Sequence, residues 1–332
     1  MTSEVTKAYH LCQTYYKTKA KILKLEKLHE WDRYVPLFPK VSEKYTYSQA
    51  KSIILDSFGS FSPEFSKIAK LHFENNWIDA KIVKNKRAGA FCSLMTPDHH
   101  PYILTNFNNK ISDVLTLAHE LGHAIHACLS RKQNLLQFWP STAATEIASI
   151  FAESIVFDYI FYNTQNTKLK LNLLATKLEQ TFATIFRQTA FYLFESDIHV
   201  HRRQEGELSK NQIKNYFQKR LQTMFGDGLT LTKNHSLWWA YVLHFYHYNF
   251  YVFTYAFGEN LTNALYNTYK TTNNKPNFVS KYINALEAGS SLSPAQIINK
   301  MDIDISNTIF WKSSIGLLQN QLDAFHNLAS KT

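Results

Sequence analysis

Glycine and proline are scarce in this sequence, with nine glycines and eight prolines in 332 residues. Both lie well below the usual frequencies of about 7% and 5%. Few chain breakers, together with 45% apolar residues, favour a mainly helical protein over a β-sandwich, a collagen-like repeat or a disordered chain. The scattered glycines form no Walker or Rossmann loop, so nucleotide chemistry of those two kinds is excluded.

Cysteines and long apolar runs are also few. The three cysteines, Cys12, Cys92 and Cys128, lack CxxC spacing, which is typical of free thiols in a reducing compartment. No run approaches the ~18 apolar residues of a membrane-spanning helix, and the first residues lack the apolar core of a signal peptide. We therefore expect a cytoplasmic protein with no membrane partner.

Basic residues outnumber acidic ones by 36 to 26, which gives a formal net charge of +10. Such an excess can mark a surface for nucleic acid, membranes or acidic substrates. Here the basic residues are spread along the chain, and the densest run, Lys17 to Lys27, has the spacing of a solvated helix face. A compositional bias explains the charge better, and we expect no nucleic-acid partner.

The spacing of apolar residues predicts many helices and one small sheet. We expect helices over residues 4–30, 48–58, 62–77, 113–130, 142–162, 167–205, 209–225, 236–272 (one or two helices), 277–289, 294–300 and 307–328. Short apolar or β-branched segments predict strands over Arg87–Ser93 and Tyr102–Phe107. Ser62-Pro63-Glu64 is typical of a helix start, because serine caps the helix, proline suits its first turn and glutamate favours its positive end.

The segment His119-Glu120-Leu121-Gly122-His123 matches the HExxH pattern. Residues four apart lie on one face of a helix, so both imidazoles can reach one zinc ion. Glu120 then lies beside the metal's open position, where it can accept a proton from water. Two ordinary surface histidines are the alternative. The apolar neighbours weigh against it, because ionisable groups there are costly unless they bind a partner or a metal.

A zinc peptidase site needs a third protein ligand, which should come from a neighbouring helix. The candidates are Glu146 and Glu153, seven residues apart and therefore on one helical face, whereas Asp158 lies further round. One carboxylate can bind the metal while the other orients a ligand. An ordinary ion-paired surface carboxylate is the alternative for Glu153. Spacing alone favours neither glutamate as the ligand.

An aromatic block over residues 239–258 contains several polar side chains. His244, Tyr248, Tyr251 and Tyr255 follow one another at intervals of three or four, which predicts one stripe along a helix. A peptidase needs hydrogen-bond donors for the oxyanion of its tetrahedral intermediate, and this stripe could supply them. Aromatic residues at helical spacing are more often part of a core.

Several segments together resemble a known family, the oligopeptidase F branch of the thimet-oligopeptidase-like zinc metallopeptidases, which are HExxH enzymes of the gluzincin type. The matching segments are Thr14–Leu37, KRAGAFC at Lys86–Cys92, HPYILTNF at His100–Phe107, TLAHELGHAIH at Thr116–His126, EIASIFAE at Glu146–Glu153 and HFYHYNFYVFTYAFG at His244–Gly258. They occur in the family's order and span essentially the whole chain.

The resemblance implies a metal site with one Zn²⁺ ion. His119 and His123 correspond to the paired ligands and Glu120 to the general base. The third ligand of the family is the glutamate that opens its E-x-x-S segment, which is Glu146 here. Glu153 then corresponds to an acid that orients a ligand.

The resemblance also implies residues that contact the substrate. Gly89, Ala90 and Phe91 resemble the strand whose edge pairs with the peptide backbone. His244 and a tyrosine resemble the oxyanion donors. The tyrosine candidates are Tyr251 and Tyr255. The family's pattern at this place is FYVY, whereas this chain reads FYVF, so Phe253 stands where the family has a tyrosine.

The resemblance implies a mainly α fold, a zincin-like catalytic lobe with one small sheet near the active site. We expect one metallopeptidase domain over residues 1–332, with a helical lead-in over 1–80, the sheet over 86–107, the zinc-site helices over 113–163 and further helices over 167–330. The family has two lobes around a channel that admits short unstructured peptides. Most members are longer, with an N-terminal half that has no counterpart here.

The expected function is a zinc-dependent metalloendopeptidase that hydrolyses short oligopeptides, with Glu120 activating the attacking water. The missing half gives the alternative. The chain would then be a zinc-bearing non-catalytic remnant, or one subunit of a split oligopeptidase that needs a separate N-terminal lobe as its partner.

Overall fold

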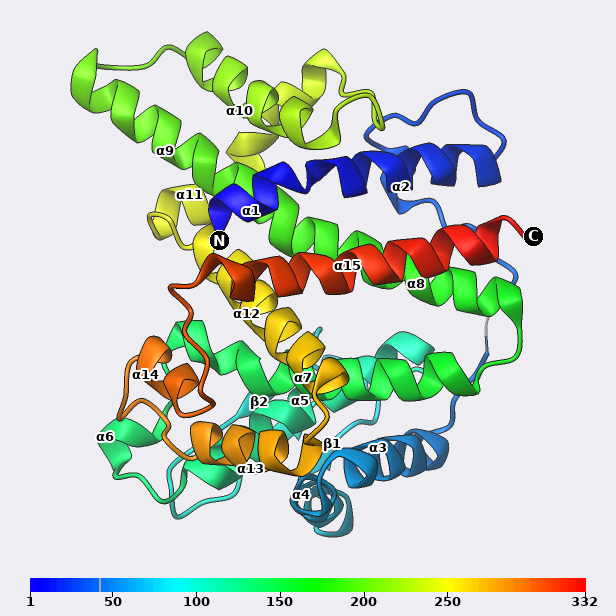
Figure 1. The fold of residues 1–332 in the computed structure, drawn as a ribbon, viewed down its shortest axis with the longest axis vertical. Helices are drawn as coiled ribbons and strands as arrows, with labels where there is room; N and C mark the ends of the chain where they lie inside the picture. Colours follow the sequence, from blue (N-terminus) through cyan, green and yellow to red (C-terminus); the bar gives the residue numbers. More distant parts are fainter. Residues whose placement is uncertain (42) are drawn as a thin grey trace. The chain divides into compact units, whose positions relative to one another are not determined.

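The computed structural model describes residues 1–41 and 43–332, and the side chains of residues 142 and 143 lie outside this description. The described chain divides into two compact units. The first unit contains Met1–Pro39, Asn166–Asn260 and Ile315–Thr332, and the second contains Lys40–Gln165 and Leu261–Ser314. The expected mainly helical fold with one small sheet is confirmed (Figure 1). The single catalytic domain over 1–332 stays a prediction.

The first unit is helical. Its elements are α1 (Thr2–Lys7), α2 (Tyr9–Ile22), a 3₁₀ turn η1 (Asp32–Tyr34), α8 (Thr167–Thr181), a π-helical segment η2 (Phe182–Arg187), α9 (Gln188–Gln204), α10 (Lys210–Phe225), a 3₁₀ segment η3 (Lys233–Tyr241), α11 (His244–His247), the start of α12 (Val252–Thr271) and the end of α15 (Thr308–Ala329). Aromatic rings fill the core of this unit. The centroid of the Tyr15 ring lies 5.5 Å from that of Phe182 and 5.1 Å from that of Phe325.

The predicted helix over residues 4–30 is wrong in its extent. It breaks at Ala8, and α2 ends at Ile22 because Lys24 takes a left-handed conformation with φ of 58°. The residues that follow pair with a distant segment instead, since Thr230 N–H donates to Leu28 O at 2.8 Å and Glu30 N–H donates to Thr230 O at 3.1 Å. Tertiary pairing therefore overrides the helical spacing there.

The second unit contains the sheet and the HExxH helix. Its elements are α3 (Tyr47–Phe61), α4 (Pro63–Glu74), β1 (Ile78–Asp79), β2 (Phe91–Ser93), β3 (Tyr102–Leu104), α5 (Ile111–Ser130), α6 (Leu135–Phe138), α7 (Thr142–Asn163), α13 (Lys275–Leu286), α14 (Pro294–Asn299), the rest of α12 and the start of α15. The predicted helix start at Ser62 is confirmed, because its hydroxyl accepts a hydrogen bond from Phe65 N–H at 3.4 Å.

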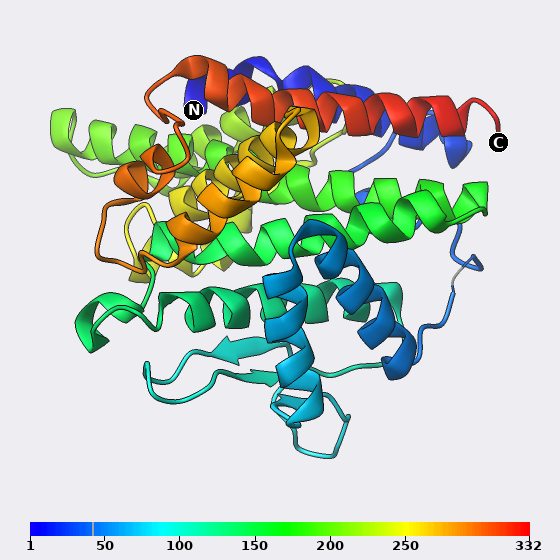
Figure 2. The same ribbon diagram turned by 60° about the horizontal axis from the view of Figure 1, so that its bottom comes forward.

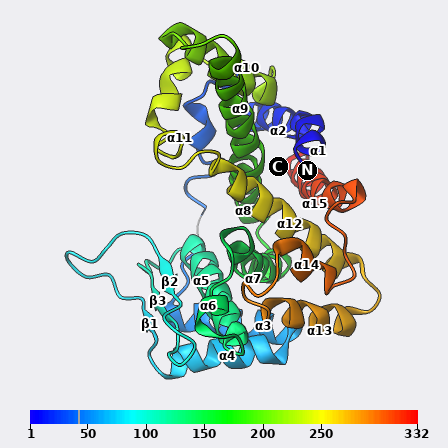
Figure 3. The same cartoon turned by 90° about the vertical axis from the view of Figure 1, so that its left-hand side faces the viewer.

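The sheet has three short strands in the order β1-β3-β2. β1 runs parallel to β3, and β2 runs antiparallel to it with Cys92 opposite Ile103. Figures 2 and 3 show the strands running beside α5. The expected strands over 87–93 and 102–107 are too long, and β1 was not expected. Gly89 has φ of 86°, and the Asn106 amide donates to Arg87 O and Gly89 O, so the chain bends before β2.

The predicted helical stripe through residues 244–255 is wrong. The segment is divided between α11 and α12, with an extended Tyr248 and a left-handed Phe250 (φ 59°) between the two helices. Among the described residues, no helix is long and apolar enough to span a membrane.

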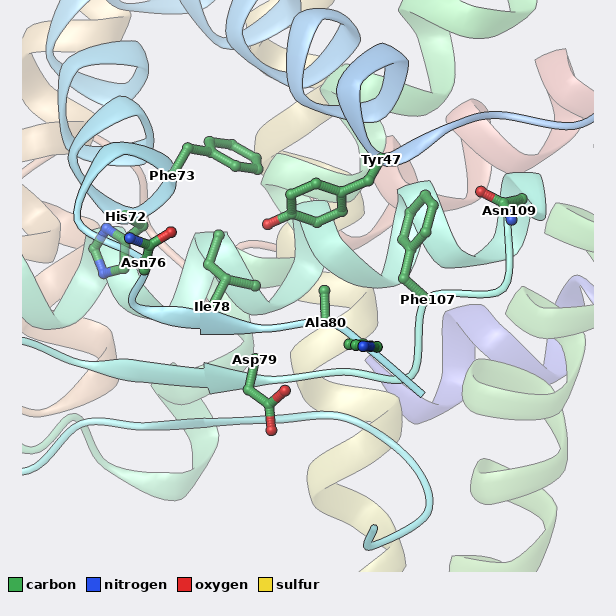
Figure 4. A pocket seen from close by; sticks show the side chains of 10 residues that line it. Tyr47, His72, Phe73, Asn76, Ile78, Asp79, Ala80, Phe107 and Asn109 are labelled. Carbon is green, nitrogen blue, oxygen red and sulfur yellow. The ribbon is translucent and has the colours of Figure 1, made fainter. Parts of the chain in front are cut away.

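A cavity of about 440 Å³ lies beside the sheet in the second unit. Figure 4 shows Tyr47, Phe73 and Phe107 gathered around it, with Ile78 of the edge strand β1 below them. The predicted metal, catalytic and substrate-binding residues are not among those that line this cavity.

Candidate metal centre

A close crossing of α5 and α7 brings the predicted metal ligands together. Gly122 lies at the crossing, where a β-carbon would meet Ser149 Cα at 2.5 Å and Ala148 O at 2.6 Å. The two backbones can approach this closely only because glycine has no side chain. His119 and His123 lie on either side of Gly122 on α5, and Glu146 lies one turn before Ser149 on α7.

The ligand atoms converge on one point. His119 Nε2 lies 3.3 Å and His123 Nε2 3.7 Å from Glu146 Oε2, and the three ligand atoms lie within 4.8 Å of one another. Zinc bonds of about 2.1 Å in a tetrahedron place neighbouring ligand atoms about 3.4 Å apart. The structure therefore brings together the three residues that the sequence predicts, in the donor set and spacing that suit zinc.

Further contacts hold each ligand in orientation. Glu153 Oε2 lies 3.5 Å from His119 Nδ1, on the side of the ring away from Glu146. The Ser149 hydroxyl donates to Glu146 Oε2 at 2.8 Å. His123 hydrogen-bonds to the backbone of Thr145. These partners fix the imidazole tautomers and leave the Nε2 atoms facing the shared carboxylate.

The electrostatic surroundings of the three predicted ligands favour a positive charge between them. Burial lowers the pKa of His119, but hydrogen bonds and charges from Glu146 and Glu153 outweigh it and raise the pKa to about 10. Burial raises the pKa of Glu146, but His119, His123 and Ser149 outweigh it and hold the pKa at about 2. Burial lowers the pKa of His123 to about 4, so this ring is neutral at physiological pH. A bound cation would supply the charge that these carboxylates attract.

Glu120 has the surroundings of a proton acceptor. Its side chain is only 6% exposed, and its carboxylate accepts a hydrogen bond from the backbone of Cys92 in β2. Oε2 has no hydrogen-bond partner within the described part of the chain. Burial raises the pKa of Glu120, the nearby His119 opposes this rise and Glu146 adds to it, and together they bring the pKa to about 7. A general base works best with a pKa near the working pH.

Asp158, the third acidic residue considered for the metal, is engaged elsewhere. Its carboxylate accepts hydrogen bonds from Tyr266 Oη at 2.8 Å and Lys270 Nζ at 2.5 Å. It is not part of the group of residues whose ligand atoms converge.

The predicted oxyanion donors form a cluster of their own in the first unit. His244 Nε2 and Tyr255 Oη are 3.2 Å apart, and the rings of His244 and Tyr251 stack with centroids 5.4 Å apart. Tyr248 lies beside Tyr251 and is 66% exposed. The residues therefore meet across a turn between two helices, although the continuous helix that suggested the grouping does not exist.

The predicted substrate strand is only partly a strand. β2 begins at Phe91 and lies at an edge of the sheet, whereas Gly89 and Ala90 precede it in the bend. Their contact with a peptide stays a prediction.

Sequence reasoning missed three supports of the site. Gly122 was quoted only as part of the motif, although a glycine inside an apolar helix often marks close backbone packing. Ser149 was quoted only as the serine of the E-x-x-S segment, although helical spacing places it one turn after Glu146. The Cys92 backbone that holds Glu120 leaves no trace in sequence.

The model of peptidase family M3 matches residues 1–317. The chain belongs to this family. Oligopeptidase PepF of Bacillus subtilis is 33% identical to it over 333 residues, which is 100% of this chain and 49% of that protein. Group B oligopeptidase PepB of Streptococcus agalactiae is 31% identical, over 97% of this chain and 53% of its own length.

Solved structures agree in fold. A crystal structure described as that of a peptidase from Chlamydophila abortus has a TM-score of 0.90 and 28% identity, over 98% of this chain and 54% of that one. Oligoendopeptidase-F from Enterococcus faecium has a TM-score of 0.76 at 21% identity, over 100% of this chain and 52% of that one. The M3 chain described here thus spans about half the length of the curated relatives it matches.

We expect His126 on α5 of this family M3 chain to make a pH-dependent contribution to folding. It is 3% exposed, its ring hydrogen-bonds to the backbone of Leu286 on α13, and its Nδ1 has no partner within residues 1–41 and 43–332. Burial, with the nearby His123 adding to it, lowers the pKa of His126 to about 3. In the unfolded chain the pKa of histidine is about 6.5.

The unfolded chain therefore takes up this proton first. The contribution of neutral His126 to the free energy of unfolding is complete above about pH 6.5 and is lost as the pH falls towards 3, by at most about 1.4 kcal/mol per pH unit. His126→Gln retains a donor for Leu286 and cannot titrate. We expect its stability to fall less steeply than that of the wild type between about pH 6 and 4. Urea unfolding of both metal-free proteins across this range is the measurement, and equal slopes would contradict the assignment.

Proposed function

We propose that this chain carries the catalytic centre of a zinc-dependent endopeptidase that hydrolyses short oligopeptides. The observation that carries the proposal is the convergence of His119, His123 and Glu146 beside the unpartnered oxygen of Glu120. Two histidines and one glutamate are the protein ligands of thermolysin-type zinc peptidases, and the glutamate between the two histidines of their HExxH motif is the general base. The names of the relatives, oligopeptidase and oligoendopeptidase, support peptides as substrates.

His119, His123 and Glu146 would hold the zinc ion. The chemistry that a bound zinc ion supplies is polarisation of the scissile carbonyl and a lower pKa of the attacking water. Glu120 accepts the proton of that water through Oε2 and then passes it to the leaving amine. Glu153 keeps the Nε2 atom of His119 directed at the ligand position by accepting from the other ring nitrogen.

Two further groups would contact the peptide. Gly89 and Ala90, in the bend before β2, and Phe91, its first residue, would pair with the peptide backbone at this edge of the sheet. His244, together with Tyr251 or Tyr255, would donate hydrogen bonds to the oxyanion. The support for this second role is the membership of the M3 family and the grouping of the three polar side chains into one cluster.

Product analysis tests the endopeptidase assignment. The zinc-loaded chain is incubated with an unstructured peptide that is free at both ends, and with a version blocked at both ends. We expect mass spectrometry to show cleavage of the same internal bonds in both peptides, because the proposed site recognises backbone rather than a terminus. Sequential loss of single terminal residues, abolished by blocking the ends, would contradict the proposal.

The chain matches only about half of each curated relative, which gives a second candidate function. Because the relatives are about twice as long, this chain could need a separate N-terminal lobe before it cleaves peptides. Cleavage that begins only when the unmatched half of a relative is added to the zinc-loaded chain would favour this candidate.

A further inference from the structure

Glu195 is a buried carboxylate that contacts the turn between α11 and α12. It lies on α9, is 2% exposed, and its Oε1 accepts a hydrogen bond from the backbone N–H of Phe250 at 3.0 Å. Oε2 has no partner within the part of the chain that the structure describes. Burial raises the pKa of Glu195, and the hydrogen bond from Phe250 opposes this rise. A buried carboxylate with a single backbone partner is costly to keep, which points to a requirement at this position.

The turn that Glu195 holds is strained. Phe250 has φ of 59°, a conformation that is uncommon for a bulky aromatic residue and persists only where its surroundings impose it. The surroundings come from α9, because the Phe250 ring lies 5.9 Å from that of Tyr192 and 5.0 Å from that of His199. The hydrogen bond to Glu195 completes this anchorage, so α9 determines where the backbone of residues 248–251 runs.

The turn separates the residues of the His-Tyr cluster. His244 opens α11, Tyr251 is the last residue of the turn, and Tyr255 lies in the first turn of α12. The contact between His244 Nε2 and Tyr255 Oη at 3.2 Å spans the turn, and so does the stacking of His244 on Tyr251. No regular helix connects these residues, so their contact depends on the path of residues 248–251.

We propose that Glu195 is a positioning residue for the proposed oxyanion donors. By accepting the Phe250 N–H, it holds the left-handed turn and thereby sets His244 against Tyr251 and Tyr255. The expected effect on catalysis rests on the proposed function. The expected effect on the turn at Phe250 does not, because it concerns the first unit alone.

The experiment compares three variants on the zinc-loaded chain. Glu195→Ala removes the acceptor, and Glu195→Gln keeps an acceptor oxygen of similar position. Asp197→Ala is the matched control, because Asp197 lies on the same helix and pairs with Arg220 at 2.6 Å instead of contacting the turn. The two readouts are hydrogen exchange of the Phe250 amide and the separate values of kcat and KM for peptide cleavage.

We expect the Phe250 amide to exchange at least about 10-fold faster in Glu195→Ala than in the wild type, because its hydrogen bond is lost. We also expect kcat to fall about 10- to 100-fold with KM little changed, because the donors act on the transition state. Glu195→Gln should retain protection of the amide and most of kcat, and Asp197→Ala should leave both unchanged.

Two results would overturn the inference. One is wild-type exchange and wild-type kcat in Glu195→Ala, and the other is an equal loss in Asp197→Ala, which would indicate a general effect of destabilising α9. If the wild-type chain cleaves no peptide, the proposed function fails, and exchange at Phe250 still decides whether Glu195 holds the turn. If Glu195→Ala does not fold, Glu195→Gln decides, since loss of amide protection in that variant would contradict the role of the acceptor.

Discussion

Replacing Glu120 by glutamine is expected to lower the rate of peptide cleavage by about 10²–10⁴-fold while zinc stays bound. Glu120 is not one of the converging metal ligands, and the amide keeps the volume and an acceptor oxygen for the Cys92 backbone. An amide cannot accept the proton of the attacking water. The measurement pairs peptide hydrolysis with the zinc content of the same samples.

The matched control is Glu74→Gln. Glu74 is a carboxylate in the same unit that forms an exposed ion pair with Lys70 at 3.6 Å, and its substitution should leave both activity and zinc content unchanged. Cleavage at the wild-type rate by zinc-loaded Glu120→Gln would show that another group takes the proton.

Replacing Gly122 by alanine is expected to damage the metal centre through the crossing of α5 and α7. The new β-carbon would lie 2.5 Å from Ser149 Cα, so the two backbones must separate. Overpacking of this kind costs about 1–3 kcal/mol or more. The separation also moves His119 and His123 away from Glu146, and a loss of about 10–100-fold in zinc affinity is expected for such disturbed support. Urea unfolding of the metal-free chain and a competitive zinc titration measure the two effects.

Gly59→Ala is the control for this substitution. Gly59 also lies within a helix of the second unit, but its β-carbon would meet Ser66 at an ordinary 3.7 Å. Alanine should stabilise this position by up to about 1 kcal/mol, because it favours the helix more than glycine does. If Gly122→Ala matches Gly59→Ala in stability and in zinc affinity, the close crossing does not hold the metal centre together.

Part of the metal site could be predicted because three of its residues are close together in the sequence. His119, Glu120 and His123 lie within two turns of one helix, and any helix at that position sets their relative directions. Glu146 could not be distinguished from Glu153 by spacing, since both share a face of α7. The resemblance to a family supported Glu146, and in the structure its carboxylate meets both histidines while that of Glu153 lies behind one of them.

The remainder depends on contacts between distant segments. Helical spacing grouped His244, Tyr251 and Tyr255 correctly but for a wrong reason, because contacts from Glu195 and Tyr192 bend the chain at Phe250. The strand bounds failed because hydrogen bonds from Asn106 decide where β2 begins. The strand β1 has only two residues, so it shows no alternation of apolar and polar side chains from which a strand could be predicted. None of these contacts involves residues close in sequence, so no local pattern reveals them.

The most direct test of the account is the chelator sensitivity of peptide cleavage by the purified 332-residue chain alone. A quenched peptide is incubated with the zinc-loaded chain, with the chain after chelation, and with the chelated chain after zinc is restored. The account predicts cleavage in the first sample, none in the second, and recovery at about one zinc ion per chain. A folded, zinc-loaded chain that cleaves no peptide, or cleavage that persists after zinc is removed, would contradict it.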